Sequence, residues 1–176
     1  MEYVYLSNGV SIPQIGFGTY PLKGDNLKAA LSSAINAGYV LFDTAFLYQN
    51  EKEIGDFLAD SNVDRKRVFL TSKLQGIQYV GRKRYLYLDK VSVQKAYKQS
   101  CKRLNTDYLD LYMLHSPFSG YCQAYRELIN LFEAGKVRAI GVSNFNVNEL
   151  SVLRQHCGIF PLINQIEIHP FKPNLI

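Results

Sequence analysis

The chain of 176 residues has no tryptophan and only 3 cysteines and 3 histidines. Cys101, Cys122 and Cys157 are odd in number, lie far apart and form no C-x-x-C pair. This pattern argues against a disulfide framework or a zinc site and fits the reduced thiols of a cytosolic protein. The histidines show neither i, i+4 nor H-E-x-x-H spacing, so we expect no metal site.

Long apolar segments and strong charge are also absent. The longest apolar run, AGYVLFDTAFLY, is interrupted by Asp43 and is too short to cross a bilayer. The N-terminal residues MEYVYLSNGV lack a basic region followed by an apolar region, so we expect no signal peptide. A net charge of +5 is too small by itself to imply nucleic acid and equally suits an anionic small molecule such as a dinucleotide. We expect a cytoplasmic protein with neither a membrane nor a nucleic-acid partner.

One short cluster combines basic and aromatic residues. Residues 79–87, YVGRKRYLY, interleave Arg82, Lys83 and Arg84 with tyrosines, a combination that can bind single-stranded nucleic acid. A single short cluster on a mildly basic chain is more simply a solvated loop. Its position after the third expected strand leaves a further alternative, that it attracts an anionic substrate or part of a cofactor.

Apolar periodicity predicts a hairpin followed by alternating strands and helices. Residues 3–6 and 10–12 flank Asn8-Gly9, a strong hairpin signal. Short apolar runs predict strands at 14–19, 40–44, 68–73, 109–115, 139–144 and 162–169. Between them, residues 27–35, 91–104 and 121–134 have helical periodicity, and Gly38 and Gly135 end the first and last of these helices. Asn50 with Glu53, and Asn146 with Glu149, have the spacing of capping boxes at two more helix starts.

This alternation indicates stacked βαβ units, an α/β fold with parallel strands, and a single domain over residues 1–176. A doubly wound sheet and a (β/α)8 barrel both fit the alternation. The sequence around Gly16 and Gly18 does not decide between them, because Pro21 stands at the last position of a G-x-G-x-x-G motif.

Four polar residues follow or end successive expected strands: Asp43, Tyr48, Lys73 and His115. Parallel α/β folds place their chemistry at the carboxyl ends of strands, so we expect these side chains to meet. A buried aspartate needs a partner, for which Lys73 is available, and a neighbouring ammonium lowers the pKa of a phenol from about 10. Tyr48 would then serve as a proton donor while His115 orients a substrate oxygen. Each residue alone more often has a structural role, so the hypothesis of a proton-donating site depends on the four residues occurring together.

The chain closely resembles the N-terminal two-thirds of an aldo-keto reductase, particularly the bacterial diketogluconate-reductase-like members. The matching motifs extend over almost the whole chain: GFGTY at 16–20, FDTAFLYQNE at 42–51, FLTSKL at 69–74, DYLDLYMLHSP at 107–117, GKVRAIGVSNF at 135–145 and INQIEIHP at 163–170. The resemblance implies a TIM-type (β/α)8 barrel with an N-terminal β-hairpin, of which this chain would supply six of the eight βα units.

The same resemblance implies an NAD(P)H-dependent oxidoreductase that reduces an aldehyde or ketone to an alcohol. Its catalytic residues would be Asp43, Tyr48, Lys73 and His115, with Tyr48 as the proton donor. NADPH is the expected cofactor, with NADH as the alternative, and a small carbonyl compound is the expected substrate. The implied cofactor-binding residues are Gly18, Thr19, Asp43, Ser143, Asn144 and Gln165. Helix capping would also explain Ser143 or Asn144, whereas Gln165 within an apolar strand is harder to explain structurally.

Two departures from the family pattern leave alternatives open. The units beyond the sixth strand would carry the aromatic residue that stacks on nicotinamide and the loop that binds the adenosine phosphate. The chain could therefore be a non-catalytic remnant or an interaction module, or a partner chain could complete the barrel. Gln75 and Ser116 also stand where many relatives have tryptophan, which predicts a more polar or more open substrate pocket.

Overall fold

A computed structural model describes residues 2–61, 63–80, 83–86 and 89–172. Its centre is a parallel sheet of six strands in the spatial order β10-β9-β8-β5-β4-β3. The strands are β3 (Phe17–Gly18), β4 (Leu41–Asp43), β5 (Phe69–Leu74), β8 (Leu109–Leu114), β9 (Val137–Ser143) and β10 (Ile163–Gln165). Each parallel strand lies beside its predecessor in sequence, and the order never reverses. A doubly wound sheet requires such a reversal, so the topology is that of a barrel.

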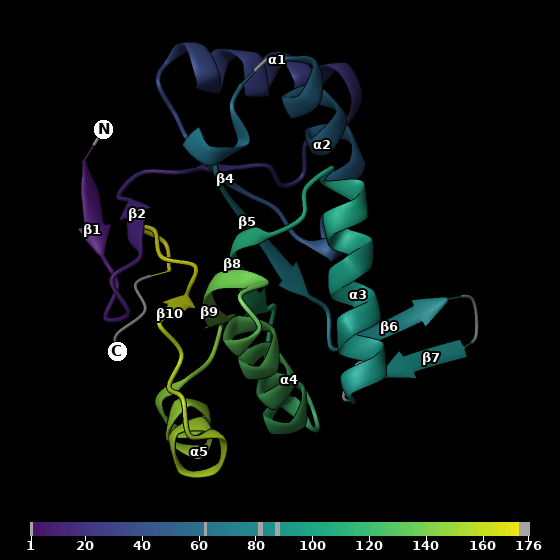
Figure 1. The fold of residues 1–176 in the computed structure, drawn as a ribbon, viewed down its shortest axis with the longest axis vertical. Coiled ribbons are helices and arrows are strands. Elements are labelled where there is room, and N and C mark those ends of the chain that lie inside the picture. Colours follow the sequence, from purple (N-terminus) through teal and green to yellow (C-terminus); the bar gives the residue numbers. More distant parts are fainter. Residues whose placement is uncertain (1, 62, 81–82, 87–88, 173–176) are drawn as a thin grey trace.

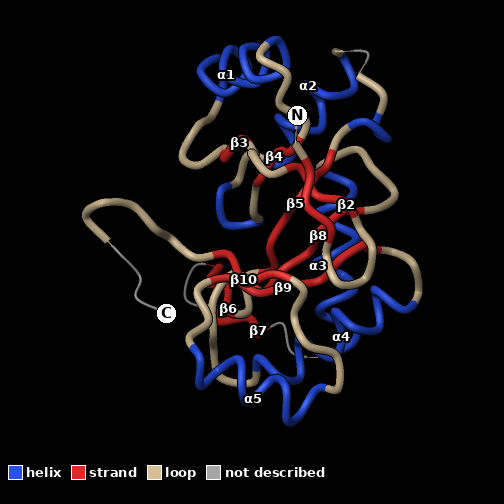
Figure 2. Tube along the Cα trace, turned by 90° about the vertical axis from the view of Figure 1, so that its left-hand side faces the viewer, coloured by secondary structure: helices blue, strands red, loops and turns tan. Residues whose placement is uncertain are grey.

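Helices connect the parallel strands and lie along the outside of the curled sheet (Figures 1 and 2). They are α1 (Gly24–Asn36), α2 (Glu51–Asp60), α3 (Lys90–Arg103), α4 (Tyr121–Glu133) and α5 (Val147–Cys157), with short 3-10 turns η1 (Phe46–Tyr48) and η2 (Arg65–Arg67). The expected helix ends at Gly38 and Gly135 are confirmed, with φ values of 87° and 65°. None of the helices in the described ranges is both long and apolar enough to span a membrane.

Alternating side chains along the strands form two separate cores. In β4 and β5, Phe42 and Leu70 belong to the larger core between sheet and helices. Leu41 and Phe69, their neighbours in sequence, belong to a smaller core with Met113 on the concave face. Burial on both faces is why these strands read as continuous apolar runs. The predicted incomplete TIM-type fold is confirmed by this open, six-stranded half-barrel.

The predicted N-terminal hairpin is also confirmed, by β1 (Tyr3–Tyr5) paired antiparallel with β2 (Ser11–Pro13). Of the two turn residues, Gly9 takes a positive φ of 82°, and Asn8 does not. The Asn8 side chain instead accepts a hydrogen bond from Val10 N at 3.2 Å and donates one to Arg138 O at 3.0 Å. Leu6, Val10 and Ile12 pack against the concave core, so the hairpin covers part of the barrel interior.

A second antiparallel hairpin follows β5, where the sequence indicated a loop. Strands β6 (Ile77–Val80) and β7 (Lys83–Leu86) pair with each other, and Figure 1 shows them projecting beside α3. The side chains of the basic and aromatic cluster at 79–87 lie outside the described residues. The two alternatives to a solvated loop, nucleic-acid binding and anion attraction, are therefore not tested.

The two predicted capping boxes have different outcomes. Asn146 and Glu149 form the reciprocal hydrogen bonds of a capping box at the start of α5. Asn50 is the N-cap of α2 but makes no side-chain cap, and the carboxylate of Glu53 accepts from Gly24 N instead. The capping-box prediction at Asn50 is wrong because tertiary contacts engage both side chains.

Candidate active site

The ammonium of Lys73 lies at the centre of the predicted group. Its Nζ donates to Asp43 Oδ2 at 2.6 Å, to the Thr44 carbonyl oxygen at 3.1 Å and to the Tyr48 hydroxyl oxygen at 3.4 Å. These three acceptors match the three donors of an ammonium group. The Lys73 side chain is fully buried, so this complete set of partners explains how its charge is tolerated inside the protein. Lys73 therefore joins β4, β5 and the η1 turn that carries Tyr48.

Asp43 receives hydrogen bonds from three side chains on two strands. Besides Lys73, the Thr71 hydroxyl on β5 donates to Oδ1 at 2.5 Å, and Gln165 Nε2 on β10 donates to the same oxygen at 3.3 Å. The side chain of Asp43 is 14% exposed. The carboxylate is thus fixed from both sides, and it is positioned to hold Lys73 against Tyr48. Thr71 was missed by sequence reasoning, although its place two residues before Lys73 puts both side chains on one face of β5.

The electrostatics at Tyr48 correct one expectation. The sequence predicted that Lys73 lowers the pKa of Tyr48, but burial, followed by the charges of Asp43 and Tyr20, raises this pKa to about 12. The Lys73 charge is largely balanced by Asp43, and burial lowers the pKa of Lys73 itself. The phenol is therefore protonated throughout the neutral range. Its ring lies against Tyr20, with centroids 5.0 Å apart.

His115 completes the group from the end of β8. Its ring meets Tyr48 edge-on, with centroids 5.6 Å apart. Burial, followed by the positive charge of Lys73, lowers the pKa of His115 to about 4, so the imidazole is neutral at neutral pH. Its Nδ1 is buried and has no hydrogen-bond partner in the ranges given above. A neutral ring with an unsatisfied polar atom beside a phenol suits the binding of a polar ligand.

The residues expected to bind a carboxamide lie at the neighbouring edge of the sheet. Asn144 Nδ2 donates to Ser143 Oγ at 3.0 Å and to the His115 carbonyl oxygen at 3.3 Å, and Asn144 N donates to Gln165 O at 2.8 Å. Neither Ser143 nor Asn144 caps α5, because Asn146 does. Asn144 has a left-handed φ of 61°, which turns the chain from β9 toward α5. Amide and hydroxyl groups from two strands thus gather beside His115.

The remaining two expected pocket residues lie on or just after β3. Gly18 pairs with Asp43 in the sheet register, and a side chain there would meet open space. Thr19 is fully buried, and its hydroxyl donates to the Asp43 carbonyl oxygen at 2.9 Å. Thr19 therefore supports the backbone of Asp43, while Gly18 leaves the space beside it open.

Asn50 is a supporting residue that sequence reasoning assigned to a helix cap. It is 1% exposed, and its Nδ2 lies within hydrogen-bond distance of the Thr19 and Leu22 carbonyl oxygens, at 3.2 and 3.1 Å. Its Oδ1 accepts from the Thr44 hydroxyl at 2.7 Å, and the Thr44 carbonyl in turn accepts from Lys73. Asn50 thus ties the loop that carries Tyr20 to the loop that holds Lys73 and Tyr48.

An ion pair between buried Glu51 and partly exposed Arg103 supports the same region from behind the sheet. Glu51 is 1% exposed and accepts hydrogen bonds from the Ser72 hydroxyl at 2.6 Å and from Arg103 Nε at 2.7 Å. The Arg103 guanidinium also lies 5.0 Å from the ring centroid of Phe46 in η1. Because Ser72 precedes Lys73, the two side chains face opposite sides of β5, and the strand is anchored on both sides.

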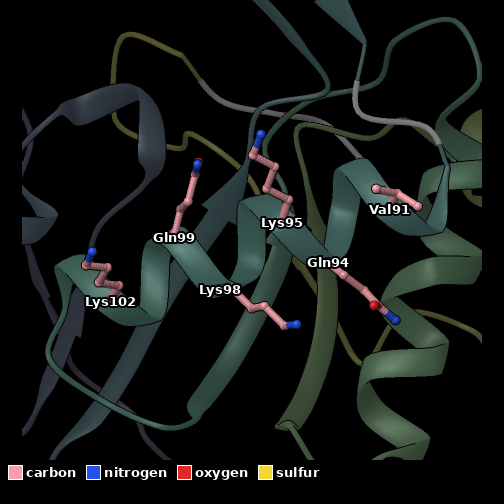
Figure 3. A pocket seen from close by; sticks show the side chains of 6 residues that line it. All are labelled: Val91, Gln94, Lys95, Lys98, Gln99 and Lys102. Carbon is pink, nitrogen blue, oxygen red and sulfur yellow. The ribbon is translucent and has the colours of Figure 1, made fainter.

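Among the larger surface cavities of the described residues, two border α3. One, of about 420 Å³, runs along the outer face of α3 and is lined by Val91, Gln94, Lys95, Lys98, Gln99 and Lys102 (Figure 3). A groove of about 520 Å³ lies between α3 and α4 and shares Gln94, Lys98 and Lys102 with the first cavity. Neither cavity is lined by any of the four residues at the strand ends, Asp43, Tyr48, Lys73 and His115. These four residues therefore remain the candidate site.

The arrangement of a buried lysine–aspartate pair, a tyrosine and a histidine at the strand ends of a barrel is typical of the aldo-keto reductases. The chain belongs to this family: residues 14–175 match the Aldo/keto reductase family. It is 36% identical to 2,5-diketo-D-gluconic acid reductase B from Corynebacterium over 97% of this chain and 59% of that protein. The predicted resemblance to diketogluconate-reductase-like members is thus confirmed.

Solved structures give the same result for the fold. An aldo/keto reductase from Brucella melitensis superposes with a TM-score of 0.87 at 37% identity, over 98% of this chain and 65% of that one. A Bombyx mori aldo-keto reductase in complex with NADP superposes with a TM-score of 0.84 at 30% identity, over 99% of this chain and 60% of that one. The chain thus spans roughly three-fifths of the length of these relatives. They contain the matched segment within a longer chain, which gives no support to the hypothesis of a partner chain completing the barrel.

Proposed function

We propose that the chain carries the catalytic half of an NADPH-dependent reductase that converts an aldehyde or ketone to an alcohol. The observation that supports this proposal best is the convergence of Asp43, Tyr48 and Lys73 at one edge of the sheet, linked by hydrogen bonds of 2.6 and 3.4 Å. A non-catalytic module would not require a fully buried ammonium held against a phenol. The assembled group therefore favours the reductase over the remnant or interaction module.

Tyr48 is the residue suited to protonate the carbonyl oxygen. With a pKa of about 12, the phenol keeps its proton at neutral pH. An alkoxide formed from a carbonyl is a stronger base than a phenolate, so proton transfer from Tyr48 is still favourable. Lys73, which donates to the phenol oxygen, stabilises the negative charge that develops there as the proton leaves.

His115 is suited to orient the carbonyl. Because its pKa is about 4, the ring is neutral and donates a hydrogen bond through one nitrogen without giving up a proton. The edge-on contact with Tyr48 places both donors on one side of the site. A carbonyl oxygen that accepts from both groups is polarised for attack at its carbon.

The edge formed by Ser143, Asn144 and Gln165 fits a nicotinamide carboxamide. These side chains offer hydroxyl and amide groups on neighbouring strands, and a carboxamide needs both donors and acceptors. When bound, a reduced nicotinamide supplies the hydride that reaches the carbonyl carbon. Gly18 leaves open space at the end of β3, next to Asp43, and the Thr19 hydroxyl supports the backbone of Asp43. The Bombyx mori relative forms a complex with NADP, which favours NADPH over NADH for this chain.

The proposal is tested by following NADPH consumption with a small aldehyde such as methylglyoxal. We expect turnover by the unaltered chain, and we expect Tyr48→Phe to reduce it ~100-fold or more, the range for loss of a general acid. The matched control is Tyr39→Phe, which removes a hydroxyl from a ring that packs against Phe17 outside the site. Absence of turnover by the unaltered chain, or equal turnover in Tyr48→Phe, would contradict the proposal.

A further inference from the structure

Two of the three cysteines lie together at the meeting point of α4 and α5, outside the candidate active site. Cys122 is the second residue of α4, and Cys157 is the last residue of α5. The Cys157 thiol donates to the Cys122 carbonyl oxygen at 3.6 Å, so the thiol of one cysteine lies against the backbone of the other. Two cysteines far apart in sequence are thus neighbours in the fold. We propose that Cys122 and Cys157 form a redox-active thiol pair that hydrogen peroxide converts to an intramolecular disulfide.

Access and flexibility at this place suit such a reaction. Both thiols are free and half-buried, so a small oxidant reaches them, whereas the third cysteine, Cys101, is buried. Each sulfur belongs to a helix end, where small backbone shifts cost least. Gly158, with φ 80°, follows Cys157 directly and ends α5. The side chains can therefore approach to bonding distance without breaking either helix.

The chemistry balances with hydrogen peroxide as a two-electron oxidant. The sulfur of one cysteine, as thiolate, attacks a peroxide oxygen, which breaks the O–O bond and gives a sulfenic acid and one water molecule. The second sulfur then attacks the sulfenic sulfur, a second water molecule leaves, and the S–S bond forms. The two thiols lose two hydrogen atoms in total.

The charged surroundings predict a pH dependence. Burial and then the neighbouring Cys122 raise the pKa of Cys157 to about 11, although Arg126 opposes this rise. Arg126 also donates to the carbonyl oxygen of His156, the residue before Cys157, at 2.8 Å. Cys157 thus remains a thiol at neutral pH, whereas the thiolate is the reactive form. The overall reaction should become faster as the pH rises above neutrality.

A disulfide here would affect the edge of the site. Tyr121, adjacent to Cys122, packs edge-on against Phe145, with centroids 5.1 Å apart. Phe145 follows Asn144, one of the residues at the cofactor edge. A bond between α4 and α5 would fix this contact and would raise the temperature of thermal unfolding.

The test treats the full chain with hydrogen peroxide, denatures it, counts the remaining thiols and identifies linked peptides by mass spectrometry. We expect loss of two of the three thiols, a peptide pair linked through Cys122 and Cys157, and full recovery after dithiothreitol. Cys101→Ser should form the same link, whereas Cys122→Ser and Cys157→Ser should not. Three free thiols after treatment, or a link that involves Cys101 or a second molecule, would overturn the proposal. None of these results depends on reductase activity.

Discussion

Gln165 and Asp43 are 122 positions apart in sequence, yet Gln165 Nε2 lies 3.3 Å from Asp43 Oδ1. Their strands, β10 and β4, are separated in the sheet by β9, β8 and β5. In a flat sheet these four strand intervals would place the strands about 19 Å apart, further than the two side chains span. The hydrogen bond therefore depends on the curl of the sheet, and the curl brings the proposed cofactor-binding residue Gln165 to the carboxylate of Asp43.

Changing the amide of Gln165 to a carboxylate should reveal this proximity. We expect Gln165→Glu to be less stable than Gln165→Met by about 1–2 kcal/mol at neutral pH, because two carboxylates would then lie side by side. Urea denaturation of both variants measures the difference. It should shrink when the pH is low enough to protonate a carboxylate, and equal stability of the two variants at neutral pH would argue against the contact.

The two N-cap asparagines should differ in their effects on stability. Asn50→Ala removes a buried side chain and leaves the Thr19 and Leu22 carbonyls without their partner, so we expect a loss of about 3 kcal/mol. Asn146→Ala removes an exposed helix cap, for which about 1 kcal/mol is typical. Thermal or urea denaturation measures both variants. A larger loss of stability in Asn146→Ala than in Asn50→Ala would contradict the role of Asn50 in tertiary contacts.

Gly55 in α2 is a position where alanine should destabilise a helix. A Cβ there would lie 2.4 Å from Arg103 O and 2.7 Å from Leu104 Cα, so α2 and the end of α3 would have to separate. We expect Gly55→Ala to cost about 2 kcal/mol, although alanine is intrinsically the better helix former. Gly18→Ala is the control, since its Cβ would meet nothing within 4 Å. Comparable denaturation midpoints for the two variants would contradict the close packing.

The low pKa of His115 predicts a pH-dependent loss of stability. Between pH 6.5 and about 4, the unfolded chain binds a proton at this residue while the folded protein does not. Stability contributed by His115 is therefore present above pH 6.5 and is lost as the pH falls, by about 1–2 kcal/mol after allowance for solvent screening. His115→Gln should show a shallower decline over this range than the unaltered chain. An equal decline in the two proteins would contradict this contribution of His115.

Much of the candidate site was predictable because parallel strands end at a common edge. Asp43, Lys73 and His115 could be assigned to strand ends from apolar runs alone, and their meeting followed from the topology. The curl that adds Gln165 could not be derived from the pattern, which also fits a doubly wound sheet. It required the family resemblance or the structure.

Two failures share one physical cause, the influence of distant partners on local patterns. Asn50–Glu53 and Asn146–Glu149 have the same spacing, but Thr19 and Gly24 engage the first pair and leave no cap. The pKa of Tyr48 was predicted from Lys73 alone, whereas burial and Asp43 outweigh it. The hairpin of β6 and β7 was missed for a local reason, because the basic residues that interrupt its apolar and aromatic ones resemble a solvated loop.

The central claim, hydride transfer to a carbonyl at the edge formed by Asp43, Tyr48, Lys73 and His115, is tested most directly by isotope transfer. The chain is incubated with an aldehyde and NADPH that carries deuterium at its reactive carbon, and the alcohol is examined by NMR. We predict deuterium on the former carbonyl carbon, and none on that carbon when only the water is deuterated. An alcohol whose carbon takes deuterium from water, or no alcohol at all, would contradict the account.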